Sequence, residues 1–184
     1  MDELLKESER KMRASIDHLH LEFGKLRTGR ASVSLVEDIK VDYYGNPTPL
    51  AQAATLGTPD SKTISITPWD VSLLPVIEKA IQTSDLGLNP SNDGKVIRLT
   101  IPPLTTERRQ QLTKVVKKYA EECRVAIRNV RRDFNDKIKA REKEGEISKD
   151  EEKKGHDQIQ KLTDKFISEV DQESQAKEKD VLDV

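Results

Sequence analysis

Apolar side chains recur every three or four positions along residues 2–27. This spacing places them on one face of an α-helix. No proline interrupts the segment, and its first glycine is Gly24. The pattern therefore predicts a long amphipathic helix, and Gly29 in "TGRAS" is expected to end it. The positions on the apolar face are Leu5, Ser8, Met12, Ile16, Leu19, Phe23 and Leu26.

The same helical period returns after Leu104 and predicts two more long helices, at 107–143 and 148–184. The segment "KEGEIS" separates them, and Ser148 with Glu151 forms a capping box for the last helix. The apolar positions of the first of these helices are Leu112, Val116, Tyr119, Cys123, Ile127, Val130, Phe134 and Ile138. Those of the second are Ile159, Leu162, Phe166, Val170 and Val181.

Between these helices, residues 31–104 contain all eight prolines and show the alternation typical of short strands. The strands are expected at 39–44, 62–67 and 95–101. "GNPTP" at 45–49 is expected to form a turn. Asp70 is a candidate N-cap for a helix at 71–84, whose buried side would carry Leu74, Ile77 and Ile81. Trp69, the only tryptophan, is expected in the core of this small α/β unit, the alternative being an anchor for a binding partner.

Each long helix has a single apolar stripe, which three helices facing inward would bury together. The predicted class is therefore α+β, in which residues 1–30 and 105–184 form an elongated antiparallel three-helix bundle. A small α/β domain of β-α-β sandwich type, residues 31–104, is inserted between the first and second helices. Because the bundle buries all three apolar stripes and leaves none exposed for a second copy, we expect a monomer.

Two lengths of chain, 28–31 and 102–105, connect the two predicted domains. Gly29 would supply backbone freedom, whereas Pro102 and Pro103 would stiffen the return path. The pair is therefore a candidate hinge, the alternative being an ordinary linker pair. The residues of the candidate hinge are Thr28, Gly29, Arg30, Ala31, Pro102, Pro103, Leu104 and Thr105.

Composition agrees with exposed helices and thin cores, since 35% of the residues are charged and only 4% are aromatic. The single cysteine excludes an internal disulfide. No apolar run is long enough to span a bilayer, and the N-terminus lacks the features of a secretory signal or a transit peptide. We therefore expect a soluble cytoplasmic protein that does not associate with membranes.

Residues able to carry out catalysis or to bind a metal are not grouped in the sequence. His18 and His20 lie on different faces of the first helix, and His156 is remote from both. Cys123 falls on a buried stripe, as a core thiol does. "GLNPSNDGK" at 87–95 has the wrong spacing for a phosphate-binding loop. We therefore expect no enzymatic activity, no metal and no cofactor.

Charge is unevenly distributed along a chain whose formal net charge is −1. Residues 107–143 carry 13 basic and 6 acidic side chains, whereas 148–184 carry 7 and 11. On a helical wheel, four arginines of the central helix fall within about 100° of one another, beside the apolar stripe. They are Arg124, Arg128, Arg131 and Arg132. Their position predicts an outward basic ridge.

A guanidinium group offers a planar fork that suits phosphate oxygens, so the ridge is a candidate site for RNA or another polyanion. Arg131 and Arg128 are the first choices for contact with it, and Arg108 and Arg109 would extend the ridge towards the hinge. The alternative is that these arginines only pair with the acidic third helix. A helical adaptor or a DNA-binding protein could use the same surface.

Six stretches, in order and with matching spacing, resemble the bacterial ribosome recycling factor family. They are "LRTGRAS" (26–32), "VDYYGNPTPL" (41–50), "VIEKAIQTSDLGLNPSNDG" (76–94), "IPPLTTERR" (101–109), "RVAIRNVRRDFND" (124–136) and "IQKLTDKFI" (159–167). Two positions depart from the family pattern. Thr106 replaces an acidic residue, and Phe134 stands where a small residue is usual.

The resemblance implies a non-enzymatic translation factor, L-shaped and of tRNA-like dimensions. Such a factor enters the ribosome after termination, with its helical domain against large-subunit rRNA. Elongation factor G, using GTP, then drives the subunits apart, and mRNA and tRNA are released. The resemblance carries the rRNA-binding role to the arginines of "RVAIRNVRRDFND".

Overall fold

The computed structural model describes residues 1–182 and divides them into two compact units. The first, here called the bundle unit, contains residues 1–26 and 106–182. The second, the sheet unit, contains residues 27–105. Helices from the two ends of the chain form a bundle, and a small β-sheet domain lies between them in sequence, so the predicted α+β class is confirmed.

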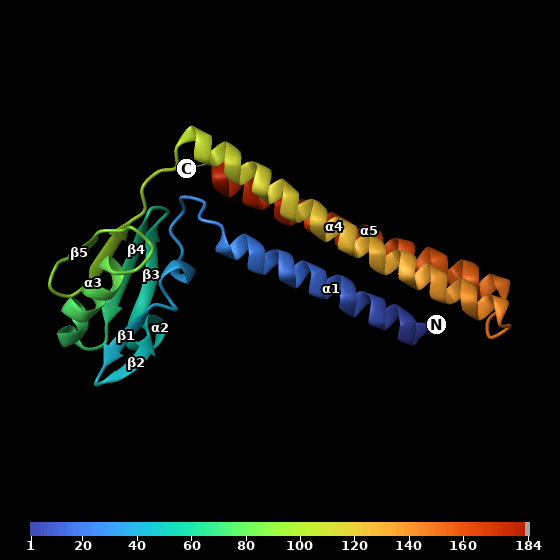
Figure 1. Ribbon diagram of the computed structural model, residues 1–184, viewed down its shortest axis with the longest axis horizontal. Helices are drawn as coiled ribbons and strands as arrows, with labels where there is room; N and C mark the ends of the chain where they lie inside the picture. The colour runs from blue at the N-terminus through green and yellow to red at the C-terminus, as the bar shows by residue number, and fades with distance from the viewer. Residues whose placement is uncertain (183–184) are drawn as a thin grey trace. The chain divides into compact units, whose positions relative to one another are not determined.

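The bundle unit is built from three long helices: α1 (Asp2–Lys25), α4 (Thr106–Lys143) and α5 (Lys149–Leu182). Helix α4 runs antiparallel to the other two (Figure 1). Their predicted apolar faces meet in one core, in which Met12, Ile127 and Phe166 are completely buried. Helices α4 and α5 share the most extensive contact, along nearly their whole length.

The ends of these helices follow local chemistry. The predicted capping box is confirmed, since the Glu151 carboxylate accepts from the Ser148 N–H at 2.8 Å and the Ser148 hydroxyl accepts from the Glu151 N–H at 3.2 Å. Helix α1 ends earlier than predicted, because Leu26 already has an extended backbone with ψ of 124°. Gly29 therefore lies beyond the helix end and does not cap it.

The sheet unit has a four-stranded antiparallel sheet in the order β3-β4-β6-β5. A separate hairpin pairs β1 with β2. The strands are β1 (Lys40–Tyr43), β2 (Asn46–Pro49), β3 (Ala54–Asp60), β4 (Thr63–Pro68), β5 (Pro90–Asn92) and β6 (Ile97–Thr100). The helical segments are η1 (Val33–Leu35), α2 (Leu50–Ala53), η2 (Val71–Leu73) and α3 (Leu74–Gln82).

Helix α3 packs its apolar side into the core of the sheet unit. As predicted, Leu74, Ile77 and Ile81 are buried, and they join Ile64 and Ile97 of the sheet. The predicted cap at Asp70 is also present, since its carboxylate accepts from the Ser72 N–H at 2.9 Å. That cap starts the short 3₁₀ turn η2, which continues directly into α3.

Two predictions for the sheet unit are wrong. The predicted turn at 45–49 is mostly strand β2, and the reversal occurs at Tyr44 and Gly45, both with positive φ. Trp69 is not in the core, because 67% of its surface is exposed. The alternation of β4 explains the second error. Ile64, Ile66 and Pro68 point inward, so the next residue points outward.

Candidate functional site

Arg124 connects two helices of the bundle. Its Nε donates to Asp171 of α5 at 2.8 Å, and its Nη2 lies 2.7 Å from the same carboxylate. Its Nη1 donates to Glu121 on α4 at 3.1 Å. The side chain is only 22% exposed. The expectation that this arginine points outward is therefore wrong, because the helical wheel could not show that α5 packs against this flank of α4.

Arg128 shares the same carboxylate. Its Nη1 donates to Glu121 at 3.1 Å, so two guanidinium groups hold one glutamate. Hydrogen bonds from Arg124 and then from Arg128 lower the pKa of the Glu121 carboxyl below its ordinary value. With Asp171 included, the two positive charges face two negative ones, so this part of the cluster has no net charge.

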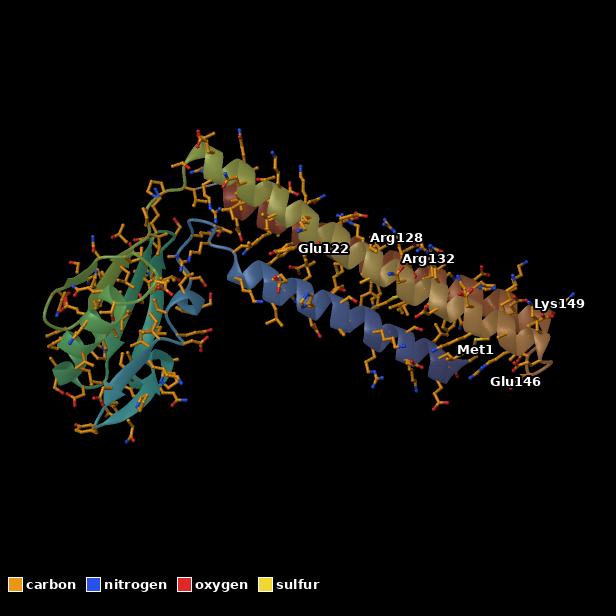
Figure 2. All side chains as sticks on the ribbon, viewed as in Figure 1. Met1, Glu122, Arg128, Arg132, Glu146 and Lys149 are labelled. Atoms are coloured by element: carbon orange, nitrogen blue, oxygen red, sulfur yellow. The ribbon has the colours of Figure 1, made fainter. Side chains whose placement is uncertain are left out.

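Arg131 and Arg132 have neutral partners instead. Arg131 donates to the amide oxygen of Gln160 on α5 at 3.0 Å, and Arg132 donates to the amide oxygen of Asn129 at 3.3 Å. Arg132 is exposed, and Arg131 is partly exposed. Because amide oxygens do not cancel charge, these two residues supply the net positive charge of the arginine cluster. Figure 2 shows Arg128 and Arg132 one turn apart on α4.

Arg108 and Arg109 lie in the first turn of α4, about 22–24 Å along the helix axis from Arg124. Arg108 donates to Gln111 at 3.3 Å, and Arg109 donates to the Leu182 carbonyl at the end of α5 at 3.1 Å. The second contact is typical of a cation at a helix C-terminus. The structure therefore does not bring these two residues together with the four others.

The candidate hinge residues lie within the sheet unit. Gly29 has φ of +76°, and a Cβ there would lie 2.9 Å from Leu104 Cγ, so the two connecting segments pack against each other. The first segment, and the residue that precedes the second, are also bonded to the turn between β3 and β4. Ala31 N–H donates to Ser61 O at 2.8 Å, and Ile101 N–H donates to Lys62 O at 2.7 Å.

The remaining parts of the candidate hinge differ in burial. Thr28 and Gly29 are buried, whereas Pro102 and Pro103 are exposed. The segments 28–31 and 102–105 thus have specific packing contacts at Gly29 and Leu104 and are not two unattached linkers. Their role as a hinge stays a prediction.

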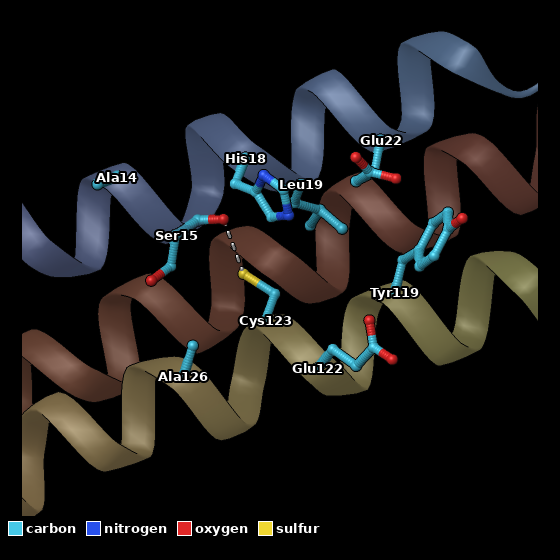
Figure 3. Close-up of a pocket in the computed structure, with 9 residues that line it drawn as sticks. All are labelled: Ala14, Ser15, His18, Leu19, Glu22, Tyr119, Glu122, Cys123 and Ala126. Carbon is cyan, nitrogen blue, oxygen red and sulfur yellow. Dashed lines mark hydrogen bonds between the residues drawn. The ribbon is translucent and has the colours of Figure 1, made fainter.

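A hollow of about 400 Å³ lies between α1 and α4, and Cys123 of α4 is one of the residues that line it (Figure 3). Cys123 is buried as predicted, and its thiol donates to the Ser15 carbonyl at 3.4 Å. Burial raises the pKa of that thiol to about 11, so it is protonated at neutral pH and unsuited to act as a nucleophile. His18, Glu22 and Glu122 also line this hollow.

Within residues 1–182, no group of three or more His, Cys, Asp or Glu side chains is placed to hold a metal ion. In the same part of the chain, no helix combines the length and the apolar character that crossing a membrane requires.

The sequence could have indicated some of the partners that the structure assigns to the arginines. Glu121 lies three positions before Arg124 and seven before Arg128, on the same helix face. Asp171 and Gln160 could not be identified, because the register of α5 against α4 is not encoded in any local pattern.

Comparisons with known proteins agree with the fold. The family described as "Ribosome recycling factor" matches residues 19–182. The chain is 54% identical over 184 residues to the "Ribosome-recycling factor" of Nitratidesulfovibrio vulgaris (strain DP4), covering 100% of this chain and 99% of that one. It is 53% identical over 182 residues to that of Clostridioides difficile (strain 630), covering 99% and 98%.

Two solved structures are also similar. The "solution structure of the ribosome recycling factor" aligns with a TM-score of 0.77 at 45% identity, covering 100% of this chain and 97% of that one. The second is described as models for the T. thermophilus ribosome recycling factor and the E. coli elongation factor G bound to the E. coli post-termination complex. It aligns with a TM-score of 0.68 at 48% identity, covering 98% of each chain. On the extent of these matches, the chain belongs to the ribosome recycling factor family.

Proposed function

We propose that this chain recycles ribosomes after termination. It binds the post-termination ribosome and, with elongation factor G and GTP, separates the subunits and releases mRNA and tRNA. Family membership over nearly the whole chain supports the role. A similar structure, described as bound with elongation factor G to the post-termination complex, supports the two partners. The chain acts as a translation factor and does not catalyse a reaction of its own.

The observation that carries the mechanism is the uncompensated charge of Arg131 and Arg132. Both project from one rigid helix, and both are bonded to amide oxygens that a phosphate can replace at little cost. Arg128 can join them by exchanging Glu121 for a phosphate oxygen. Arg124 instead stabilises the bundle. Contacts to phosphate fix the position of a protein on RNA and make its affinity strongly dependent on salt.

We also propose that the sheet unit moves while the bundle unit is held by rRNA. The boundaries of the two units lie between residues 26 and 27 and between 105 and 106. Because Gly29 and Leu104 pack together inside the sheet unit, bending would occur at these two boundaries. Rotation there turns the sheet unit as one body, and elongation factor G acting on it would transmit force to contacts between the subunits.

The test compares the double variant Arg131→Glu/Arg132→Glu with Lys153→Glu/Lys154→Glu. The second pair changes the charge equally, at two exposed positions of α5. Co-sedimentation with post-termination ribosomes gives the affinity at several salt concentrations. Light scattering with elongation factor G and GTP follows splitting of the subunits.

We expect the arginine variant to bind at least about 100-fold more weakly, because it loses two charge-assisted phosphate contacts of about 1.5–3 kcal/mol each. The slope of log affinity against log salt concentration should become shallower by about two, because two phosphate contacts are lost. The lysine pair should behave as the unchanged protein. Equal binding and splitting by both variants would reject the arginine pair as the rRNA contact.

A further inference from the structure

The sheet unit exposes three large apolar side chains within one small region. Tyr44 is 79% exposed, Trp69 is 67% exposed and Val71 is 58% exposed. The Tyr44 hydroxyl donates to the Asp70 carboxylate at 3.1 Å, which brings the β1–β2 turn against the segment that carries the other two. Tyr44, Trp69 and Val71 are here called the aromatic patch. The alternation of β4 accounts for the outward direction of Trp69, but the proposed rRNA contact gives none of the three residues a role.

The aromatic patch is held in place by specific bonds. Trp69 Nε1 donates to the Thr55 hydroxyl at 3.2 Å, and the Trp69 backbone N–H donates to the Ala53 carbonyl at 3.2 Å. The Tyr44 ring packs edge-on against Tyr43, with the ring centroids 4.7 Å apart. Rigid aromatic side chains lose little conformational entropy on binding, and they are the residues that most often anchor protein interfaces.

The segments that form the patch carry only acidic charges. Asp42 and Asp70 lie on the two segments that form it, 41–47 and 67–73, and neither these segments nor 53–57 contain a lysine or an arginine. Lys40 lies at the opposite end of β1 from the turn that carries Tyr44. Hydrogen bonds from Ser72 and Tyr44 lower the pKa of the Asp70 carboxyl, so it is charged at neutral pH. A phosphate backbone would meet repulsion here.

We propose that the aromatic patch docks a basic segment of a partner protein. Guanidinium or ammonium groups would stack on the faces of Trp69 and Tyr44 and pair with Asp70 and Asp42. Arginine suits the site better than lysine, because its planar group stacks on an aromatic ring and forms a fork with a carboxylate at once. The inference rests on the sheet unit alone and does not require the proposed function.

The chain offers a direct probe, because Trp69 is its only tryptophan. Its emission and its single indole N–H resonance both report on the patch. The full-length protein is titrated with deca-arginine, deca-lysine, deca-glutamate and a ten-nucleotide single-stranded RNA. We expect a saturable shift of the indole resonance with deca-arginine, a weaker one with deca-lysine and none with the other two.

Three variants locate the interaction. Tyr44→Ala removes a stacking face. Asp70→Asn removes the charge while keeping an oxygen that can cap η2 and accept from Tyr44. Val125→Ala changes another exposed apolar residue, on the bundle unit, and is the control. Tyr44→Ala should weaken deca-arginine binding about two- to five-fold, the effect of an exposed cation–π contact of about 0.5–1 kcal/mol. Asp70→Asn should weaken it by up to about five-fold, the effect of an exposed ion pair of up to about 1 kcal/mol. The control should leave binding unchanged.

Four results would overturn the proposal. The first is an indole resonance that deca-arginine does not move, as when the peptide binds only the acidic helix α5. The second is Asp70→Asn binding as tightly as the unchanged protein. The third is a larger shift with RNA than with deca-arginine. The fourth is self-association in sedimentation that Tyr44→Ala abolishes, since that would assign the patch to a second copy of the chain.

Discussion

Arg124 forms an ion pair with Asp171 across the interface between α4 and α5 through two nitrogens, Nε at 2.8 Å and Nη2 at 2.7 Å. The two residues are far apart in sequence and lie on antiparallel helices. Their ion pair favours one register between α4 and α5, which otherwise meet mainly through apolar contacts. An arginine that the sequence places on a nucleic-acid-binding ridge therefore serves the fold. Its neighbours Arg131 and Arg132 are bonded to amide oxygens instead, and they are the proposed phosphate contacts.

Replacing Arg124 should destabilise the bundle, whereas replacing Arg132 should not. Arg124→Ala breaks charge-assisted bonds from a mostly buried guanidinium to carboxylates that are about half exposed. Because solvent screens the two carboxylates, we expect it to lower the free energy of unfolding by about 1 kcal/mol. Arg132→Ala should change it by less than about 0.5 kcal/mol, as surface substitutions do. Urea unfolding followed by far-UV circular dichroism measures both.

A double-mutant cycle with Asp171→Ala tests whether the pair itself is responsible. If Arg124→Ala costs as much in the Asp171→Ala background as in the unchanged protein, the contribution arises from the bond to Glu121 or from packing of the arginine stem. A clear coupling between the two substitutions assigns it to the ion pair.

The bundle could be predicted because its stripes are regular. Met12, Ile127 and Phe166 follow a helical period without interruption, and each is fully buried. The strands of the sheet unit were only partly predictable. β2 contains two prolines and β5 consists of Pro-Ser-Asn, so neither shows the alternation or the β-branched residues by which strands are recognised. Their pairing depends on neighbours distant in sequence.

The sequence predicts which arginines lie close together in the candidate site, but not which of them are paired with carboxylates. The clustering of Arg124, Arg128 and Arg131 on one side of a helix follows from their spacing alone. Which of them is neutralised depends on where Asp171 and Gln160 of α5 fall beside them. The exposure of Trp69 could have been predicted locally, since it directly follows Pro68, a strand residue that points inward. The general preference of tryptophan for burial favoured the opposite prediction.

Gly29→Ala should destabilise the sheet unit more than Gly45→Ala. Both glycines have positive φ, which costs an alanine about 1–2 kcal/mol. At Gly29 the new methyl group also lies 2.9 Å from Leu104 Cγ, whereas nothing lies within 4 Å at Gly45. Urea unfolding followed by Trp69 emission reports on this unit. Equal losses in the two variants would contradict close packing of the connecting segments.

Asp93 should make the sheet unit sensitive to acid. The backbone N–H of Val96, the Arg98 guanidinium and the backbone N–H of Lys95 lower the pKa of its carboxyl to about 2. An unfolded aspartate has a pKa of about 3.9. The stabilisation is therefore complete above about pH 4 and is lost as the pH falls towards 2.

The variant Asp93→Asn keeps an acceptor for the backbone N–H groups and removes the titration. We expect its unfolding midpoint, followed by Trp69 emission, to depend less on pH between about 4 and 2 than that of the unchanged protein. An identical slope in the two proteins would show that this turn does not titrate as its geometry requires.

Two helical glycines of the bundle should respond to alanine in opposite directions. A Cβ at Gly24 in α1 would have nothing within 4 Å, so Gly24→Ala should stabilise the bundle by up to about 1 kcal/mol through helix propensity. At Gly155 in α5 a Cβ would lie 2.5 Å from Ile138 Cδ1. Overpacking of a buried contact costs about 1–3 kcal/mol, so Gly155→Ala should be destabilising overall.

The close approach of α5 to α4 at Gly155 makes a sharper test available. Ile138→Val removes the Cδ1 atom that the new methyl group would meet, at a cost of about 0.5–1.5 kcal/mol on its own. If the clash is the cause, the double variant Gly155→Ala/Ile138→Val should lose less stability than the sum of the two single losses. The free energies of unfolding are measured by urea unfolding followed by circular dichroism. If the two single losses simply add in the double variant, the clash with Cδ1 is not the cause of the loss.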